Sequence, residues 1–413
     1  MPVRRTGIER ILVTRGMQLQ VRQTGWQVVA AGGVAIFCST LYVLSFAVLL
    51  KPLTEEFSWS REAVSRAYAC MTLAVAVSAP LIGHLVDRLG PRPVVGPFLV
   101  IAAAAFASLT LLTPHLWHLY IVFLVIGLVV PANSPVVYSR VVSSWFDRHR
   151  GIALATVIAS AGVGGIVHPP LTQYLIRMLG WRTACLTLGS VVMAVGFPIV
   201  VAFVRNPPDT ARVVSNSTGA TIGEALRSRV FWTLLLVVFG GSLPISALVV
   251  HLGALLTDRG VPAERAALAL SAMGAASLVG RLITGWLLDR FTATRVSVAL
   301  LTLASVGMLL LISSQSLAIA LMAAALIGFG TGGEVDVTPY LLSRYFGLRS
   351  LGMLYGLNWT AFGLSGAVGP VLMGRAFDAT HSYDSVLMAL AVGLIVSAAL
   401  MLTLPAYRRS LSA

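Results

Sequence analysis

Long apolar stretches recur along the whole chain, and they constrain its fold more than any other feature. A helix that crosses a lipid bilayer needs about 20 mostly apolar residues. Twelve windows meet this requirement: 26–50, 62–86, 94–112, 117–139, 151–176, 183–204, 231–256, 265–288, 296–313, 317–340, 351–374 and 384–406. Lipid offers the backbone no hydrogen-bond partners, so each window is expected to be a helix. Only 11% of the residues are charged, against roughly 25% in soluble proteins, so we predict an all-α membrane protein with twelve transmembrane helices.

The polar intervals divide these windows into two sets of six. The longest interval is rich in Pro, Ser, Asn and Thr and is expected to be a loop. We therefore predict a cytoplasmic N-terminal segment, a six-helix bundle, a cytoplasmic linker, a second six-helix bundle and a cytoplasmic tail. Their boundaries are 1–25, 26–204, 205–229, 230–406 and 407–413.

The formal net charge of +14 indicates an orientation in the membrane rather than nucleic-acid binding, because the basic residues are scattered singly between apolar stretches. Basic residues favour the cytoplasmic side of a membrane protein. Of the 29 Lys and Arg residues, 20 fall on the side of the two termini and eight on the opposite side. Residues 1–22 lack the short apolar core of a cleavable signal peptide. We expect a multi-pass protein of a cell membrane, the bacterial inner membrane, with both termini cytoplasmic.

The two sets of six windows resemble each other. The segment GHLVDRLGPRPVV at 83–95 follows the second window, and GWLLDRFTATRVS at 285–297 follows the eighth. Further along, WFDRHRGIAL at 145–154 matches YFGLRSLGML at 345–354. Duplicated six-helix halves around a central substrate cavity are a recurrent architecture of transporters. The repeat therefore predicts two pseudo-repeated bundles.

The motif G-x-x-x-D-R-x-G-x-R at 83–92 resembles the signature loop of the major facilitator superfamily, and 285–295 holds a degraded copy. Within that superfamily the chain resembles the monocarboxylate and oxalate:formate branch, through FSWSR at 57–61, WFDRHRGIALATVIASAG at 145–162 and an arginine inside the eighth window. The acidic-Gly-Gly-Trp opening of that branch is reduced here to TGWQVV at 24–29. The resemblance implies the major facilitator fold and alternating access, with the first, fourth, seventh and tenth spans lining the cavity.

Arg281 is the arginine inside the eighth window. It lies eight residues before Asp289, which places it about 12 Å along the helix from the membrane surface. A guanidinium at that depth costs at least about 2.5–3.5 kcal/mol, so it is expected to face a cavity or a partner. Its planar fork matches a carboxylate in bidentate geometry. The family resemblance likewise implies that Arg281 holds the substrate carboxylate, and the alternative is a structural ion pair without a ligand.

Glu334 and Asp336 lie at a similar depth in the tenth window. Two positions apart, they point in nearly opposite directions unless the helix is broken. One of them is a candidate proton-coupling residue, and the alternative is a structural partner for Arg281 or a neighbouring helix. His251, at the outer end of the seventh window, is a further candidate for proton exchange because histidine titrates near neutral pH. Its alternative is a hydrogen-bonded interfacial histidine.

Other polar side chains inside the windows are candidate substrate contacts, because each must satisfy its polar atoms with another helix, water or a ligand. Trp359, which follows the candidate Asn358 in the chain, could cap an apolar part of the substrate. For any single one, helix packing is the alternative. The candidates are Tyr42, Asn133, Tyr340 and Asn358.

The signature loop and its copy predict a gate at the cytoplasmic surface. Asp87 can pair with Arg88 or Arg92 at facing helix ends, and Asp289 takes the corresponding place in the second half. These residues are expected to control the change of conformation rather than to contact the substrate.

We therefore predict a secondary-active transporter of small organic anions, most of all monocarboxylates, that works by proton symport or anion exchange. No P-loop, zinc-spaced Cys and His set or nucleophile elbow occurs in the sequence, so we expect no enzyme activity, catalytic residue, metal or cofactor. The expected partners are the anion, protons or a counter-anion, and the lipid bilayer, with the protein a monomer that binds no nucleic acid. The alternatives are an exporter of hydrophobic or drug-like compounds with the same fold, and a membrane-embedded receptor or enzyme.

Overall fold

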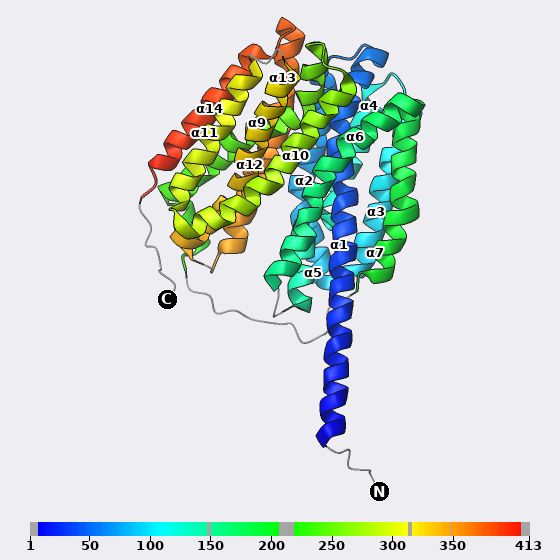
Figure 1. Ribbon diagram of the computed structural model, residues 1–413, viewed down its shortest axis with the longest axis vertical. Coiled ribbons are helices and arrows are strands. Elements are labelled where there is room, and N and C mark those ends of the chain that lie inside the picture. Colours follow the sequence, from blue (N-terminus) through cyan, green and yellow to red (C-terminus); the bar gives the residue numbers. More distant parts are fainter. Residues whose placement is uncertain (1–6, 147–149, 206–218, 313–315, 348, 406–413) are drawn as a thin grey trace.

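The computed structural model describes the backbone of residues 7–146, 150–205, 219–312, 316–347 and 349–405. In these ranges the chain is helical and holds no β-strand, and the helices run lengthwise beside one another (Figure 1). The α-helices are α1 (Gly7–Phe57), α2 (Arg61–Leu89), α3 (Arg92–Ala107), α4 (Leu116–Val129), α5 (Pro135–Trp145), α6 (Arg150–Val191), α7 (Phe197–Phe203), α8 (Ile222–Leu226), α9 (Arg229–Asp258), α10 (Ala263–Arg290), α11 (Ala293–Ile312), α12 (Leu317–Phe346), α13 (Leu351–Thr380) and α14 (Asp384–Leu402).

Ten helical segments of the described chain are long and apolar enough to cross a membrane. One of them, Ile152–Phe203, has 52 residues and turns back at Gly180, whose φ of 77° only glycine adopts easily, so it crosses twice. The 30-residue helix α13 lies among the others and completes the predicted set of twelve. The all-α membrane fold predicted from the apolar windows is therefore confirmed.

Two segments differ from the predicted windows for local reasons. The fourth crossing is interrupted by a 3-10 turn, Val130–Asn133, because Pro131 and Pro135 have no backbone N–H to continue the α-helix. Most of the predicted linker, 206–218, lies outside the described residues. Its last part contains α8, which the side chains of Thr221 and Glu224 cap reciprocally. The backbone N–H of Thr221 donates a hydrogen bond to the Glu224 carboxylate. This hydrogen bond is the main reason that the pKa of the Glu224 carboxyl lies below its usual range.

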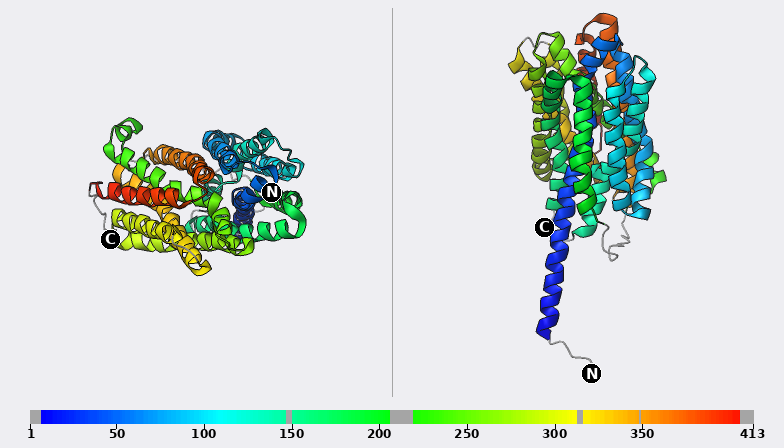
Figure 2. Two further views of the ribbon diagram at one scale, coloured as in Figure 1. Left: turned by 90° about the horizontal axis from the view of Figure 1, so that it is seen from above. Right: turned by 90° about the vertical axis from the view of Figure 1, so that its right-hand side faces the viewer.

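The crossings pack into two halves, each around its own hydrophobic core. We call α1 to α7 the N-half and α9 to α14 the C-half, and Figure 2 shows them side by side. Each core also contains residues from a helix of the other half. Ala47 and Val48 of α1 pack in the C-half core, and Val250 and Ala254 of α9 pack in the N-half core. Helices α1 and α9 therefore join the halves.

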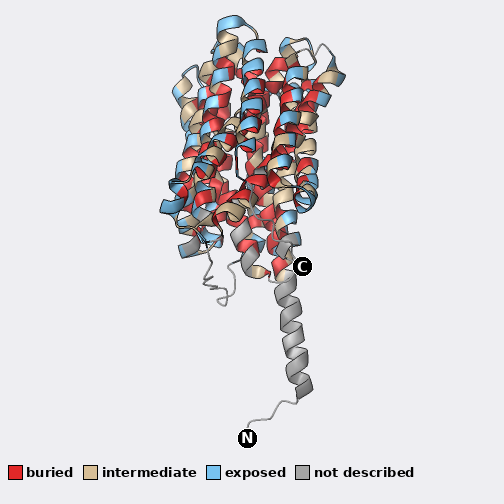
Figure 3. Cartoon of the chain, turned by 90° about the vertical axis from the view of Figure 1, so that its left-hand side faces the viewer, coloured by how far each residue is buried: buried red, intermediate tan, exposed pale blue. Residues whose placement is uncertain are grey.

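The outer surface of the bundle is apolar. Figure 3 shows that most exposed residues lie on the outside of the bundle. Large hydrophobic side chains are among the exposed residues, for example Leu81 at 68% and Leu282 at 69% exposure. Soluble monomers seldom expose continuous apolar surface on this scale. This surface therefore suits contact with lipid chains.

The halves meet most closely at one end of the bundle. Both termini and α8 lie at the other end (Figure 1), which we call the terminal end, and we call the opposite one the far end. A Cβ on Gly374 of α13 would lie 2.7 Å from the backbone nitrogen of Glu62 on α2, and one on Gly274 of α10 would lie 3.0 Å from Cα of Gly165 on α6. Small residues allow this close approach of helix backbones.

Towards the terminal end the same helices diverge. On α13, a Cβ at Gly366 would still lie 3.1 Å from Thr72 of α2. A Cβ at Gly83 of α2, on the same face as Thr72 and three turns nearer the terminal end, would meet no atom within 4 Å. The structure is therefore closed between the halves at the far end and open at the terminal end.

Candidate functional site

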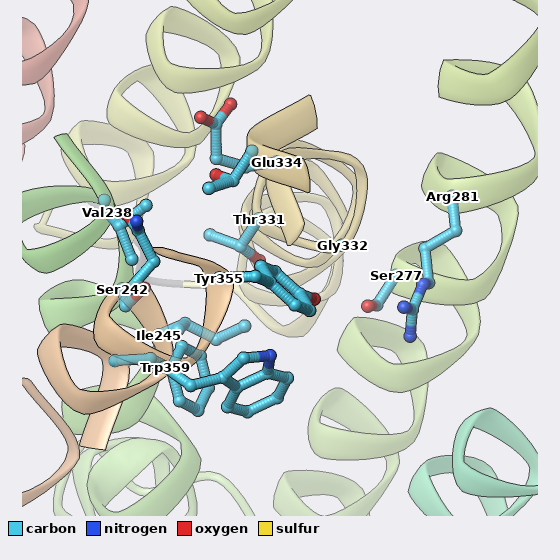
Figure 4. A pocket seen from close by; sticks show the side chains of 14 residues that line it. Val238, Ser242, Ile245, Ser277, Arg281, Thr331, Gly332, Glu334, Tyr355 and Trp359 are labelled. Carbon is cyan, nitrogen blue, oxygen red and sulfur yellow. The ribbon is translucent and has the colours of Figure 1, made fainter. Parts of the chain in front are cut away.

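A cavity of about 120 Å³ lies within the C-half, between α9, α10, α12 and α13. Arg281 and Ser277 of α10 face Tyr355 and Trp359 of α13 across it (Figure 4). We call this cavity the C-half pocket. Its lining residues are Val238, Gly241, Ser242, Ile245, Ser277, Arg281, Thr331, Gly332, Glu334, Thr338, Tyr355, Asn358, Trp359 and Phe362.

Arg281 lies on the face of α10 that is turned to the N-half. One turn earlier, Leu278 contacts α6, since a Cβ on Gly162 would lie 3.2 Å from its side chain. Ser277 and Arg281 are four residues apart and therefore share a face of the helix. Arg281 is partly exposed, and it lies one turn nearer the terminal end than the contact of Leu278 with α6. A cation in this place can meet an anion that enters from the terminal end.

Aromatic side chains form the opposite wall. Tyr355, Trp359 and Phe362 are spaced to lie on one face of α13. The ring centroids of Tyr355 and Trp359 are 6.2 Å apart and those of Trp359 and Phe362 are 5.0 Å apart, both in edge-to-face geometry. Trp359 is 40% exposed although it lines an internal pocket. The wall thus presents aromatic surface to whatever occupies the pocket.

Glu334 is buried and turned away from Arg281. The Ser297 hydroxyl of α11 contacts both of its carboxyl oxygens, at 2.9 and 2.7 Å. In Figure 4, Thr331 and Gly332 of α12 lie between Glu334 and Arg281. The structure therefore does not bring Glu334 to Arg281 as an ionic partner. The side chain of Asp336, the other predicted candidate, lies outside the described part of the chain.

The predicted lining residues of the N-half lie inside its core instead. Tyr42 is fully buried and packs against Phe106 of α3, with ring centroids 5.5 Å apart. Asn133 is buried at the interruption of the fourth crossing, where its amide donates to the Val95 carbonyl. These two side chains hold helices of the N-half together and do not join Arg281 in the C-half pocket.

Of the two candidates in the C-half, one lines the pocket and one does not. The amide nitrogen of Asn358 donates to the Leu354 carbonyl, whereas its oxygen is buried without a hydrogen-bond partner among the described residues. Asn358 therefore lines the pocket with its polar atoms turned into the protein. Tyr340 lies two turns beyond Thr331 on α12, where the Arg344 guanidinium is 5.0 Å from its ring centroid.

His251 lies at the far end and is fully buried. Its Nε2 contacts the Pro370 carbonyl and the Ser65 hydroxyl, both at 2.9 Å, and its Nδ1 lies 3.1 Å from the Tyr383 hydroxyl. A carbonyl can only accept, so Nε2 carries the proton and Nδ1 accepts from Tyr383. Both ring nitrogens are in use while the far end is closed, and a second proton on Nδ1 requires the Tyr383 hydroxyl to stop donating to it.

A network of charged groups surrounds this histidine, and the sequence did not indicate it. Arg61 donates to Asp258 and Tyr383, and its guanidinium lies 3.6 Å from the Phe377 ring centroid. The Asp378 carboxylate accepts the backbone N–H groups of Arg61 and Glu62 at 3.0 and 2.8 Å, at the N-terminus of α2. We call Arg61, His251, Asp258, Asp378 and Tyr383 the far-end clasp, because they tie α2 of the N-half to the C-half.

The predicted gating residues lie at the terminal end. Asp87 and Arg88 belong to the last turn of α2 and Arg92 to the first turn of α3, while Asp289 is in the last turn of α10. Arg88, Arg92 and Asp289 are exposed, and the side chain of Asp87 lies outside the described residues. These residues therefore lie at the end where the halves stand apart, and their role as a gate stays a prediction. Within the described ranges, no three His, Cys, Asp or Glu side chains gather to hold a metal.

Comparisons with known proteins agree with this architecture. The sequence profile of the Major Facilitator Superfamily matches residues 30–370. The MFS transporter asaE of Aspergillus flavus is 26% identical over 383 residues, which cover 87% of this chain and 82% of the relative. Monocarboxylate transporter 13 of Rattus norvegicus is 28% identical over 403 residues, which cover 92% and 89%.

Among solved structures, a bacterial homologue of the human lysosomal transporter Spinster, inward-facing and occupied, has the same fold. It matches with a TM-score of 0.72 at 14% identity, over 91% of this chain and 95% of its own. The family and the apolar helices define a multi-pass membrane transporter. The chain belongs to the Major Facilitator Superfamily, as the signature loop predicted.

Proposed function

We propose that this protein is a secondary-active transporter of small organic anions, most of all monocarboxylates. The observation that carries the proposal is Arg281, a guanidinium that lines an internal pocket roughly 12 Å along α10 from the end of that helix. Arginine presents parallel N–H donors that match a carboxylate, and Ser277 adds a hydroxyl beside it. The relatives named monocarboxylate transporters support the same substrate class.

We further propose that the terminal end faces the cytoplasm, and that the protein resides in the bacterial inner membrane as a monomer. The excess of basic residues on that side supports the orientation. The structure is then inward-facing, with the substrate released past Asp87 and Asp289. The two bundles, 26–204 and 230–406, move against each other to open the far end, and the linker 205–229 joins them.

Coupling to protons or to a counter-anion supplies the energy. We propose Glu334 as the proton-carrying group, because its carboxyl is buried against Ser297 and forms no ion pair among the described residues. Burying an ionised carboxylate without a cationic partner costs several kcal/mol, and protonation removes that cost. Asp336 is the second candidate by its place on α12, and His251 the third, at the far end.

A second candidate function, export of hydrophobic or drug-like compounds, is favoured by the aromatic wall of Tyr355, Trp359 and Phe362. Such a pocket would bind neutral aromatic compounds without using Arg281. The membrane receptor or enzyme has no comparable support in the site.

Uptake into proteoliposomes tests the proposal. The purified full chain is reconstituted, loaded with unlabelled phenylacetate or lactate, and given the same acid in radiolabelled form outside. We expect exchange of the labelled acid for the unlabelled one with at least one of the two acids. We also expect the labelled acid to accumulate in liposomes that hold no substrate, when the outside is more acidic than the inside. Flux of neutral aromatic compounds with no flux of either acid would overturn the proposal.

A further inference from the structure

We infer that the anion held by Arg281 is an aromatic monocarboxylate, with a single ring against Trp359 while the carboxylate meets the guanidinium. This inference rests on the proposed function and narrows its substrate class. Three features of the C-half pocket carry it: the placement of its charged and aromatic walls, its size, and the balance of charge among its lining residues.

The charged and aromatic walls stand opposite each other. Arg281 and Ser277 belong to α10, and Tyr355 and Trp359 to α13, with the pocket between them (Figure 4). A ligand that contacts both walls needs an anionic head and an apolar body. An acid of two carbons would leave the aromatic wall uncovered, so its binding would not use Trp359.

The volume of the pocket is similar to that of a cavity that holds one ring. Its volume is about 120 Å³, and an apolar cavity of about 150 Å³ is known to admit benzene. Aromatic pairs prefer edge-to-face or offset geometry, which the rings of Trp359, Tyr355 and Phe362 already adopt among themselves. A flat ring extends this arrangement, whereas a saturated ring of equal size gains only apolar burial.

The charges of the lining favour a monoanion. Among the described side chains that line the pocket, Arg281 and Glu334 are the charged ones, and the Glu334 carboxyl is turned to Ser297. The other polar lining groups are hydroxyls and the Asn358 amide. A second carboxylate on the ligand would face the aromatic wall without a partner, which is costly.

Four ligands of related shape test the inference by direct binding to the purified full chain: phenylacetate, cyclohexylacetate, acetate and phenylacetamide. Because phenylacetate buries a ring in an apolar site, its affinity should exceed that of acetate by on the order of ten- to a hundredfold. Cyclohexylacetate is expected to bind about three- to tenfold more weakly than phenylacetate, because it loses the aromatic contact. Phenylacetamide, which has no charge for Arg281, should bind more weakly still.

Trp359→Leu removes the ring from the wall and keeps an apolar side chain. It should weaken phenylacetate binding by about three- to tenfold, and elution of the variant as the same monodisperse species as the wild type reports that it is folded. Trp117→Leu is the matched control, because Trp117 is 60% exposed on α4 of the N-half. That variant should bind all four ligands as the wild type does.

The outcomes separate this inference from the proposed function. Equal binding of acetate and phenylacetate, or equal binding of cyclohexylacetate and phenylacetate, would overturn the aromatic class and leave the carboxylate transporter standing. Equal binding of phenylacetamide and phenylacetate would overturn the role of Arg281 and with it the proposed function. Failure of all four to bind would overturn both.

Discussion

Substitution of one glycine at the far end should open that end. Gly374 of α13 faces the N-terminus of α2, and a methyl group there would lie 2.7 Å from the Glu62 nitrogen and 2.8 Å from the Arg61 carbonyl carbon. Ordinary contact begins at 3.4 Å, so Gly374→Ala must push α2 away by about 0.7 Å. Both neighbours are backbone atoms, which cannot turn aside as a flexible side chain can. The displacement strains the contact of Asp378 with the same turn of α2.

The magnitude follows from the cost of overpacking. Extra methyl groups in packed interiors cost about 1–3 kcal/mol, and here the cost applies only while the far end is closed. That difference raises the population open at the far end by a factor of about 5 to 150. Alanine also favours the helix over glycine by about 0.5–1 kcal/mol, but it does so in both conformations and cancels.

The assay is the reaction rate of a buried cysteine with a maleimide. Val250→Cys is introduced after the native cysteines at positions 38, 70 and 185 are replaced by alanine. Val250 of α9 is fully buried and packs in the N-half core, so its labelling requires the halves to separate. The labelling rate should rise in proportion to the open population when Gly374→Ala is added.

Gly356→Ala is the control on the same helix, because a Cβ at Gly356 meets no atom within 4 Å. It should leave the labelling rate at the parent value. An unchanged rate in Gly374→Ala, or the same increase in both variants, would refute the reasoning that backbone contact at Gly374 holds the far end closed.

Three further predictions concern orientation, gating and coupling. A reporter fused after residue 215 should be cytoplasmic and one after Thr380 external, and the reverse result would contradict the proposed orientation. Asp87→Asn should slow proteoliposome transport while substrate affinity stays within a few-fold, because Asp87 lies in the last turn of α2 at the terminal end; lost affinity at an unchanged rate would argue against a gate. Glu334→Gln should still exchange substrate for substrate but lose pH-driven accumulation, and loss of both modes together would make this residue structural.

The helices and their order could be predicted from the sequence because membrane spans obey a simple physical rule. Each crossing needs about 20 apolar residues, and every predicted window corresponds to a helical crossing in the structure. Arg281 could be singled out because a cation inside a span is too costly to lack a function. Asn358 lines the same pocket, and Trp359 beside it forms part of the aromatic wall.

The faces of the helices could not be predicted in the same way. Tyr42 lies in a span that is apolar on every side, so hydropathy does not tell whether a position meets the cavity, the lipid or the core of its own half. The structure places it in the N-half core, against Phe106. Asn133 likewise lies at a break in the helix whose local direction depends on Pro131 and Pro135.

The far-end clasp was beyond sequence reasoning for another reason. Arg61 and Tyr383 are 322 residues apart in the chain. Asp258 and Asp378, taken singly, are ordinary charged residues near the ends of apolar segments. Only the packing of α2 and α9 against α13 brings them together, and one sequence carries no signal of that pairing. His251 was noticed as a titratable group, but its partners come from three other elements.

The central claim, that Arg281 holds a carboxylate, is tested most directly by the affinity of Arg281→Lys for phenylacetate. Lysine keeps the charge and loses the planar fork. The lost hydrogen bonds to a charged group correspond to about 1.5–3 kcal/mol, so the account predicts binding about tenfold to a hundredfold weaker. Phenylacetamide should bind the variant and the wild type alike. Wild-type affinity of Arg281→Lys for phenylacetate would contradict the claim and leave Arg281 a structural charge.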